Sequence, residues 1–481
     1  MISAIPQTGV RASWLSALGR FVAGVAQPTV TEAVVRIDPT GAYQTVQGWG
    51  TSLAWWGAVV GGWSEPARNA IADLVFDPAA GLGLNVVRYN IGGGDDPTHH
   101  HMRPGGAVPG YRPAPETWDP AADANQRWML RAAQVRGADV FEAFANSPPY
   151  WMTHSGCAAG SADGAGNNLR DDAVDAFAGY LAEVVAYFRD AWGLTFGSIE
   201  PFNEPAATNW RAGNNQEGCH FSRDQQRAVI ARLAAHLAAR GLGDTAIAAA
   251  DDYSIDQAVD TVASYDAATL ALIAHINTHS YSGSRRAHVR ELAARYGKAL
   301  WQSEYGNGGG PHDHAAMGPG LQLAGQIRRD MTDLRPAAWV YWQAVENEGG
   351  NNWGFIHATF TGLGEDYWLT KQYYVMAQHS RFIRPGWRVL AADDMNTLAA
   401  YDAASGTLAL VYTNAAAGAA NVAFDLSRFG ALPRAAALYR TSPTEDLARL
   451  PDVPLVDGTL QLAVPAQSVT TGILTGITAW S

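Results

Sequence analysis

The feature that most constrains the fold of this chain is a regular alternation of short apolar runs with segments of helical periodicity. The runs are rich in β-branched and aromatic residues, and they cover residues 46–53, 85–91, 140–145, 196–202, 245–250, 275–279, 299–304 and 338–342. A strand that is apolar along its whole length is typical of a parallel sheet buried on both faces. Eight strand–helix repeats therefore predict an α/β fold, a (β/α)8 TIM barrel over residues 46–384.

The pattern changes after Pro385. Residues 385–481 alternate small apolar runs with Gly, Pro, Asn and Asp turns, and helical periodicity ends, which predicts an antiparallel β-sandwich. A further strand in residues 31–45 has no place inside the barrel, so we expect it to join this C-terminal sandwich. Residues 1–30 form an N-terminal segment that resembles a signal peptide only weakly, because Arg20 and several glycines interrupt its apolar stretch. A disordered segment is the alternative there.

Composition excludes several classes of partner. The chain has 45 acidic and 33 basic residues, a net charge of −12, and no Lys/Arg-rich run, so nucleic acid is not expected as a partner. No stretch approaches the ~18 uncharged apolar residues of a membrane span, so no membrane insertion is expected. The 17 Trp, 18 Tyr and 14 Phe suit a polysaccharide or oligosaccharide, whose sugar rings offer apolar faces to aromatic side chains. We expect a monomer without a cofactor that acts outside the cell, with the cytoplasm as the alternative.

The two cysteines, Cys157 and Cys219, each stand in a Gly-rich polar loop. Two cysteines allow one pairing, and the sequence leaves two alternatives open. If the loops are neighbours, the cysteines form a disulfide, which would favour an oxidising compartment. Otherwise they are two free thiols.

Two carboxylates stand out because each ends a predicted barrel strand. Reactive side chains in such barrels project from the C-terminal ends of the strands, and Glu204 ends the fourth strand while Glu304 ends the seventh. We expect them to face each other across the barrel mouth, where two carboxyl groups are the equipment for glycoside hydrolysis. Asp251 and Asp252 end the fifth strand, but they are weaker candidates because no partner carboxylate with similar turn chemistry accompanies them.

Five short motifs occur in barrel order, and together they resemble glycoside hydrolase family 30. They are Gly48-Trp49-Gly50, Arg88-Tyr89-Asn90, Ser147-Pro148-Pro149-Tyr150-Trp151, Asn203-Glu204-Pro205 and Ser303-Glu304-Tyr305-Gly306. The loops around Cys157 and Cys219 are most similar to the endo-β-1,6-galactanase branch, which hydrolyses β-1,6-linked galactose chains such as the side chains of arabinogalactan proteins. The resemblance implies a retaining double displacement with Glu204 as acid/base and Glu304 as nucleophile. The alternatives are another glycan of the family, namely β-1,6-glucan, xylan or a glucosyl lipid, or a carbohydrate-binding barrel without catalysis.

Polar and aromatic residues near the other strand ends are candidates to bind substrate. Arg88 is the best available cation to keep Glu304 ionised, and Asn203 is placed to bind the sugar 2-hydroxyl. The full set of candidates is Trp55, Trp56, Arg88, Asn90, Asn146, Trp151, Asn203, His279, Tyr281, Tyr305 and Trp342.

A run of three histidines, residues 99–101, raises the question of a metal. Three consecutive residues on an extended loop cannot all face one ion. The neighbouring Asp95 and Asp96 favour a solvated polar loop or the rim of a substrate subsite. We therefore expect no metal.

Overall fold

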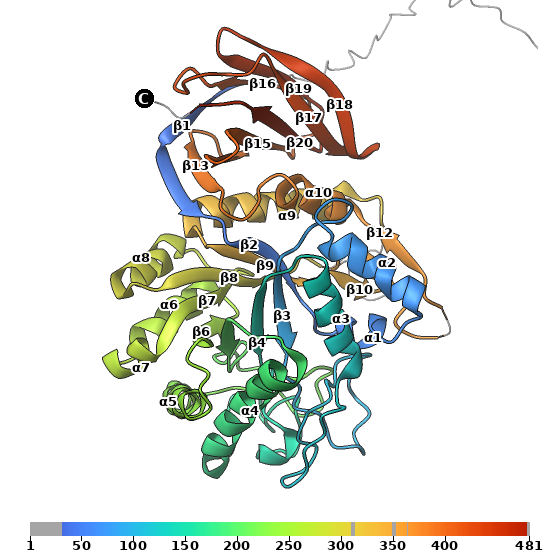
Figure 1. Cartoon of the computed structure of the whole chain (residues 1–481), viewed down its shortest axis with the longest axis vertical. Coiled ribbons are helices and arrows are strands. Elements are labelled where there is room, and N and C mark those ends of the chain that lie inside the picture. The colour runs from blue at the N-terminus through green and yellow to red at the C-terminus, as the bar shows by residue number, and fades with distance from the viewer. Residues whose placement is uncertain (1–30, 309–312, 349–352, 363, 479–481) are drawn as a thin grey trace, which may run out of the picture.

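A closed barrel of eight parallel strands forms the centre of the molecule in this computed structural model, which describes residues 31–308, 313–348, 353–362 and 364–478 (Figure 1). The strands pair in chain order, and the last pairs with the first, so the predicted TIM barrel is confirmed. They are β2 (Gly48–Ser52), β3 (Val86–Asn90), β4 (Val140–Phe144), β5 (Ser198–Glu200), β6 (Ala246–Asp252), β7 (Ile273–His279), β8 (Ala299–Tyr305) and β9 (Ala338–Gln343). The expectations for residues 1–30 lie outside the described residues.

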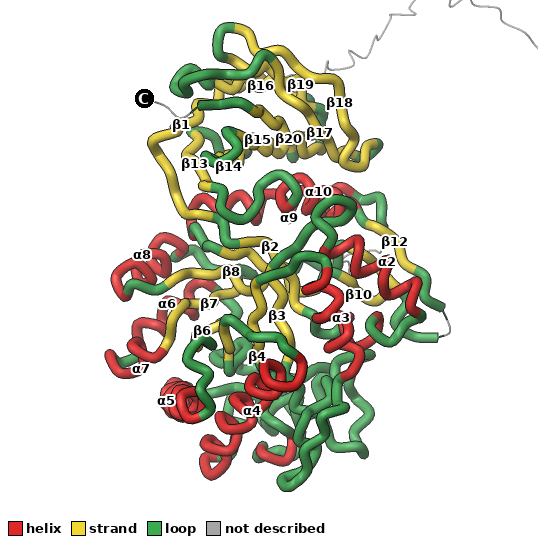
Figure 2. The backbone as a smooth tube through the Cα atoms, in the orientation of Figure 1, coloured by secondary structure: helices red, strands yellow, loops and turns green. Residues whose placement is uncertain are grey.

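Helices surround the barrel and cover the outward faces of its strands (Figure 2). The segment 255–274 forms two helices, because Asp266 accepts a hydrogen bond from the Thr269 backbone N–H at 2.8 Å and starts the second. The helices are α1 (Trp56–Val60), α2 (Glu65–Phe76), α3 (Ala124–Val135), α4 (Val174–Trp192), α5 (Arg223–Ala239), α6 (Ile255–Ser264), α7 (Ala267–Leu272), α8 (Arg286–Tyr296), α9 (Met317–Arg329) and α10 (Lys371–Ser380). None of the helices in the described residues is long and apolar enough to cross a bilayer.

Nine strands form the second unit, at the top of Figure 1. The N-terminal strand β1 (Thr31–Thr45) pairs antiparallel with β13 (Arg388–Ala392) and parallel with β16 (Ala420–Asp425), so its predicted place in the C-terminal sandwich is confirmed. The other strands are β14 (Thr397–Asp402), β15 (Thr407–Asn414), β17 (Ala435–Ser442), β18 (Glu445–Val456), β19 (Thr459–Val464) and β20 (Ser468–Thr475). Strands β1 and β18 each pair on both sides and so join the two sheets at their edges.

The loops at the C-terminal ends of the barrel strands are long and largely without regular structure. Residues 91–123 follow β3, residues 145–173 follow β4 and residues 201–222 follow β5. They gather at one end of the barrel, as the green tubes in the lower right of Figure 2 show. A small sheet of β10 (Val345–Asn347), β11 (Ile356–Ala358) and β12 (Tyr367–Leu369), which the sequence pattern did not predict, follows β9. These segments build the walls of the barrel mouth.

Candidate active site

A pocket of about 520 Å³ opens at the C-terminal mouth of the barrel. This volume lies within the roughly 300–1,000 Å³ that small-molecule sites occupy. Carboxylates, amides and aromatic rings line it, namely Trp55, Arg103, Asn203, Glu204, Asn209, Trp210, Asn214, Asn215, Gln216, Tyr253, Tyr281, Glu304, Trp342, Glu346 and Trp353. Both predicted catalytic carboxylates therefore face the same cavity.

Glu204 lies in the loop after β5 and has a left-handed backbone, with φ of +47°. A residue with a side chain adopts this conformation at a cost of about 1–2 kcal/mol, so its surroundings must hold it there. Its N–H donates to the Asp251 carbonyl at 2.8 Å, and its carbonyl accepts from the Ala207 N–H at 3.0 Å. The turn at Asn203-Glu204-Pro205 is thus anchored by backbone hydrogen bonds, and the Glu204 side chain lines the pocket.

Glu304 lies on β8, and two donors hold its carboxylate. The Tyr281 hydroxyl donates to Oε1 at 2.9 Å, and Arg88 Nη1 donates to Oε2 at 3.4 Å. Both interactions favour the ionised form of the carboxylate. Arg88 is thus the cation beside Glu304, at the position where the sequence analysis placed it.

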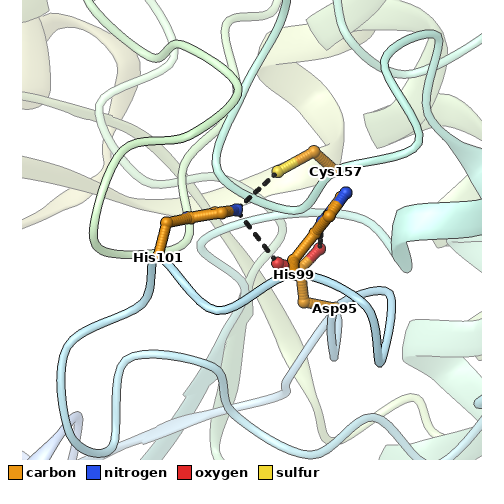
Figure 3. A group of neighbouring side chains, drawn as sticks. All are labelled: Asp95, His99, His101 and Cys157. Atoms are coloured by element: carbon orange, nitrogen blue, oxygen red, sulfur yellow. Dashed lines mark hydrogen bonds and ion pairs between the residues drawn. The ribbon is translucent and has the colours of Figure 1, made fainter.

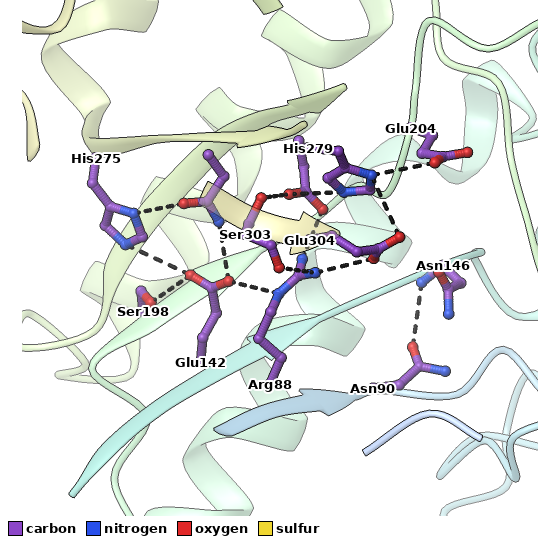
Figure 4. A network of polar contacts seen from close by, with 12 residues as sticks. Arg88, Asn90, Glu142, Asn146, Ser198, Glu204, His275, His279, Ser303 and Glu304 are labelled. Carbon is purple, nitrogen blue, oxygen red and sulfur yellow. Dashed lines mark hydrogen bonds and ion pairs between the residues drawn. The ribbon is translucent and has the colours of Figure 1, made fainter. Parts of the chain in front are cut away.

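His279 stands between the two carboxylates (Figure 4). Its Nδ1 lies 3.2 Å from Glu204 Oε1 and 3.5 Å from Glu304 Oε1, and its Nε2 lies 3.3 Å from Asp251 Oδ1. Burial opposes a charge on the imidazole, but the carboxylates of Glu304 and Asp251 outweigh burial and raise the pKa of His279 to about 10. His279 is therefore a buried cation at neutral pH.

The two carboxylates are close enough to interact. One carboxylate oxygen of Glu204 lies within 4.8 Å of one of Glu304. Burial raises the pKa of Glu304 to about 7, and the charge of Glu204 acts in the same direction, while His279 lowers it. The Glu304 carboxyl therefore holds its proton more tightly than an exposed glutamic acid does, and the charge of Glu204 is one of the causes.

A buried ionic network beneath the pocket holds Arg88 in place (Figure 4). Its Nε donates to Glu142 at 3.0 Å and its Nη2 donates to Asp251 at 2.7 Å. Burial disfavours the Asp251 carboxylate, but the charges of Arg88 and His279 outweigh burial and hold the pKa of Asp251 well below its usual range. Asp251 is fully buried and orients Arg88 and His279, so it does not compete with Glu204 and Glu304 for the substrate.

Aromatic side chains form part of the pocket wall. Trp55 and Trp342 meet edge to face with ring centroids 5.1 Å apart. The Arg103 guanidinium lies 4.1 Å from the centre of the Trp55 ring and forms an ion pair with Glu346 at 2.5 Å. The predicted tryptophans Trp55 and Trp342 therefore face the cavity, whereas Arg103 was not predicted.

Several other residues that line the pocket were not predicted from the sequence either: Asn209, Trp210, Asn214, Asn215, Gln216, Tyr253 and Trp353. The amides lie in the loop after β5, within the segment Thr208-Asn209-Trp210-Arg211-Ala212-Gly213-Asn214-Asn215-Gln216. Several amides and an indole follow Glu204 closely in the sequence. This pattern could have identified them as pocket residues.

Other predicted substrate contacts are not in the pocket. Trp56 is a core residue with no exposed surface, its ring stacks on Phe76, and the prediction for it is wrong. Trp151 donates its indole N–H to the Arg112 carbonyl at 2.8 Å and does not belong to the pocket lining. Asn90 and Asn146 also lie outside the lining; they are buried and joined by a hydrogen bond of 3.3 Å. Tyr305, whose ring lies 5.9 Å from that of Tyr281, is outside it as well. Arg88 and His279 are fully buried beside Glu304 and do not line the pocket either.

The two cysteines are free thiols, which corrects the disulfide alternative. Each faces different neighbours. Cys219 is fully buried in the main core, where its Sγ lies 3.5 Å from the His220 carbonyl. Cys157 Sγ instead lies 3.6 Å from His101 Nε2.

Comparison with known proteins identifies the family. Residues 32–351 match the family model described as O-glycosyl hydrolase family 30. The chain belongs to this family. The family 30 chain is 35% identical to an endo-β-1,6-galactanase of Hypocrea rufa over 82% of its own length and 84% of that protein. It is 26% identical to an exo-β-1,6-galactobiohydrolase of Bifidobacterium longum over 98% of its length and 42% of that protein. It is thus a glycoside hydrolase.

Solved structures with low sequence identity share the fold of this glycoside hydrolase. A conserved exported protein from Bacteroides fragilis superposes with a TM-score of 0.80 at 22% identity, covering 92% of this chain and 100% of that one. The catalytic domain of a family 30 xylanase C from Talaromyces cellulolyticus superposes with a TM-score of 0.71 at 21% identity, covering 92% and 100%. The barrel and its attached β unit are therefore a shared architecture.

Proposed function

We propose that this enzyme hydrolyses β-1,6-galactosidic linkages, including those of the β-1,6-galactan side chains of arabinogalactan, with retention of the anomeric configuration. The support for the linkage is that the Hypocrea rufa and Bifidobacterium longum relatives are both named for action on β-1,6-galactosyl chains. The support for retention comes from the geometry of the pocket.

The observation that carries the proposal is the short separation of Glu204 and Glu304. An inverting enzyme keeps its carboxyl groups roughly 6.5–9.5 Å apart so that a water molecule fits beside the sugar, whereas a retaining enzyme keeps them about 5–5.5 Å apart. Here one oxygen of Glu204 lies within 4.8 Å of one oxygen of Glu304, an oxygen-to-oxygen limit nearer to the retaining spacing than to the inverting one. This spacing favours direct attack by one carboxylate on the anomeric carbon.

In the proposed first step, the Glu304 carboxylate attacks the anomeric carbon and the glycosidic C–O bond breaks. Glu204 gives its proton to the departing oxygen. In the second step, the Glu204 carboxylate takes a proton from water, the water oxygen bonds to the anomeric carbon, and Glu304 is released as a carboxylate. Arg88 and Tyr281 stabilise that released charge, since both donate hydrogen bonds to Glu304.

Asn203 is the residue proposed to bind the sugar 2-hydroxyl. It lines the pocket next to Glu204, and its buried Oδ1 accepts no hydrogen bond from the described residues. A buried amide oxygen without a donor is costly, and a sugar hydroxyl would satisfy it. Hydrogen bonds of this kind strengthen as the oxocarbenium-like transition state forms.

The test combines two active-site variants with a panel of polymers. Glu204→Ala and Glu304→Ala should each lower turnover on de-arabinosylated arabinogalactan by at least about 10²-fold while the protein stays folded. NMR of the first product should show the β-anomer before mutarotation. Preference for β-1,6-glucan or xylan in the panel would contradict the proposed substrate, and an α-anomer would contradict retention.

We also propose that the enzyme acts outside the cell, because a polysaccharide substrate cannot enter one. Galactanase activity should therefore be recovered from the culture medium of the producing organism. Activity confined to washed and lysed cells would contradict this.

A further inference from the structure

Four side chains that could ligate a metal ion meet away from the catalytic carboxylates. They are Asp95, His99, His101 and Cys157, and Figure 3 shows them converging from two loops. One ligand atom of each lies within 4.8 Å of one of each of the others. The loop after β3 supplies the first three, and the loop after β4 supplies the cysteine. We propose that this cluster is a zinc-type metal site that joins the two loops.

The spacing of the atoms fits tetrahedral coordination. His101 Nε2 lies 3.4 Å from Asp95 Oδ2 and 3.6 Å from Cys157 Sγ. Zinc bonds of about 2.0–2.3 Å at tetrahedral angles place neighbouring ligand atoms about 3.3–3.7 Å apart. The two measured separations fall in that interval. His99 Nδ1 instead lies 3.0 Å from Asp95 Oδ1, a hydrogen-bonding distance, so Asp95 holds His99 through one carboxylate oxygen and faces His101 through the other.

The tautomer of His101 also fits a ligand. Its Nδ1 lies 2.6 Å from the Asn214 carbonyl, which can only accept a hydrogen bond, so Nδ1 carries the hydrogen. Nε2 then keeps its lone pair, and it is the nitrogen that faces the aspartate and the cysteine. Metal-binding histidines characteristically donate their other ring N–H to a carbonyl or carboxylate in this way.

The surroundings of Asp95 give an independent indication of a bound cation. Its side chain is 6% exposed, and its Oδ2 accepts no well-formed hydrogen bond from the described residues. The backbone N–H of Ala159 donates to Cys157 Sγ at 3.4 Å. A metal ion deprotonates a cysteine that it binds, and an aspartate and a thiolate together would balance the charge of a divalent ion. One sulfur, two imidazoles and one carboxylate favour zinc over the hard ions Mg²⁺ and Ca²⁺.

The site would fix one wall of the substrate pocket. The carbonyl that His101 binds belongs to Asn214, which lines the pocket, and the Arg103 N–H donates to the Asn215 carbonyl at 2.8 Å. A metal at the cluster therefore links the loops after β3 and β4 directly and the loop after β5 through Asn214. We infer a structural role, because no residue of the cluster lines the pocket.

The experiment measures metal binding by the full-length enzyme after treatment with chelator. Zinc should bind with a stoichiometry of one per chain by calorimetry and raise the melting temperature, whereas Mg²⁺ and Ca²⁺ should do neither. Co²⁺ in place of zinc should give the thiolate-to-metal charge-transfer absorption of a cysteine ligand. His101→Gln and Cys157→Ser should each weaken zinc binding by more than the roughly 10–100-fold that loss of an outer hydrogen-bond partner costs.

The matched controls are His100→Gln and Cys219→Ser. His100 belongs to the same histidine run but is exposed and outside the cluster, and Cys219 is the other free thiol. Both variants should bind zinc like the unmodified protein. If Cys157→Ser does not fold, the His101→Gln variant alone tests the proposal. Its melting temperature is then compared with that of the unmodified protein after a chelator has removed bound metal. No zinc binding by the unmodified chain, or equal binding in His101→Gln, would overturn the proposal.

Discussion

His279 Nδ1 lies 3.2 Å from Oε1 of Glu204 and thus forms an ion pair with the proposed acid/base. The Nε2 atom of the same imidazole lies 3.3 Å from Asp251 Oδ1, so carboxylates flank both ring nitrogens. This arrangement favours the imidazolium ion. The pocket therefore carries a fixed positive charge beside the two carboxylates that the reaction uses.

The charge of His279 should set the pH range of activity. In His279→Gln the positive charge that lowers the pKa of Glu304 is lost, so this pKa should rise and the acid limb of kcat/KM should move to higher pH. A kcat/KM profile against pH measures this. The exposed His288→Gln variant is the control and should keep the original profile. An unchanged acid limb in His279→Gln would contradict the electrostatic role.

The same charge should make a contribution to stability that depends on pH. Folding raises the pKa of His279 from its ordinary 6.5 to about 10, so the folded protein binds this proton more tightly than the unfolded chain does. The contribution is fully present below about pH 6.5 and is lost as the pH rises through about 10. Urea unfolding should therefore show a difference between the unmodified protein and His279→Gln that shrinks from about pH 6 to about pH 10. A constant difference would exclude this linkage.

The ionisation of Glu304 should set the acid limb of the activity. Since the pKa of Glu304 is raised to about 7, kcat/KM should rise about tenfold per pH unit as the pH approaches that value from below, because the proposed nucleophile reacts as a carboxylate. In Glu204→Gln, a galactoside with a good aryl leaving group should still react, because that group needs no proton. The acid limb should then move to lower pH for this substrate, because the charge of Glu204 no longer raises the pKa of Glu304. If the limb stays in place, another group controls it.

The strand ends could be predicted from the sequence because barrel strands are apolar along their length. Glu204 and Glu304 interrupt that pattern where the strands end, so residue type and position indicate the same site. Whether a given side chain points into the pocket or into the core could not be predicted in this way. Trp55 and Trp56 are adjacent and identical in type, yet one lines the pocket and the other packs in the core at the start of α1. Helix α1 has only five residues, too few for a periodicity to show which face is buried.

Contacts between irregular loops could not be predicted either. Three consecutive histidines were expected not to share one ion, and the exposure of His100 agrees with that expectation. Cys157 was not considered as a neighbour, because it lies 56 residues from His101 in the sequence, although it is 3.6 Å from it in space. Strand β18 is hard to recognise in the sequence for a different reason. It is half exposed and contains Pro451 and Pro454, so it lacks the apolar run that marks the other strands.

Two tryptophans allow a matched test of pocket against core. Trp342→Phe should raise KM with little effect on stability, because it reduces the aromatic surface in the pocket wall. Trp56→Phe removes an indole N–H that donates to the Ser52 carbonyl at 2.7 Å in the core, so it should cost about 1–3 kcal/mol of stability and leave KM unchanged. Steady-state kinetics and urea unfolding of both variants measure this. A raised KM in Trp56→Phe alone would reverse the assignment.

Arg88 should support stability and activity through different partners. It is fully buried and pairs with Glu142, Asp251 and Glu304, so Arg88→Met leaves uncompensated carboxylates in the barrel and should cost about 3–5 kcal/mol in unfolding free energy. The activity of the Arg88→Met enzyme should also fall, because Glu304 loses the cation that favours its ionised form.

A second substitution separates these two effects. Adding Glu142→Gln to Arg88→Met removes one of the unpaired buried charges. The glutamine side chain keeps the length of the glutamate and can still accept from Asn277, which donates to Glu142 at 3.0 Å. Urea unfolding should show part of the lost stability restored in the double variant. Its kcat should stay as low as that of Arg88→Met, since Glu142 does not line the pocket and Glu304 still lacks its cation. Recovery of kcat together with stability would mean that Arg88 acts on the reaction only by holding the barrel together.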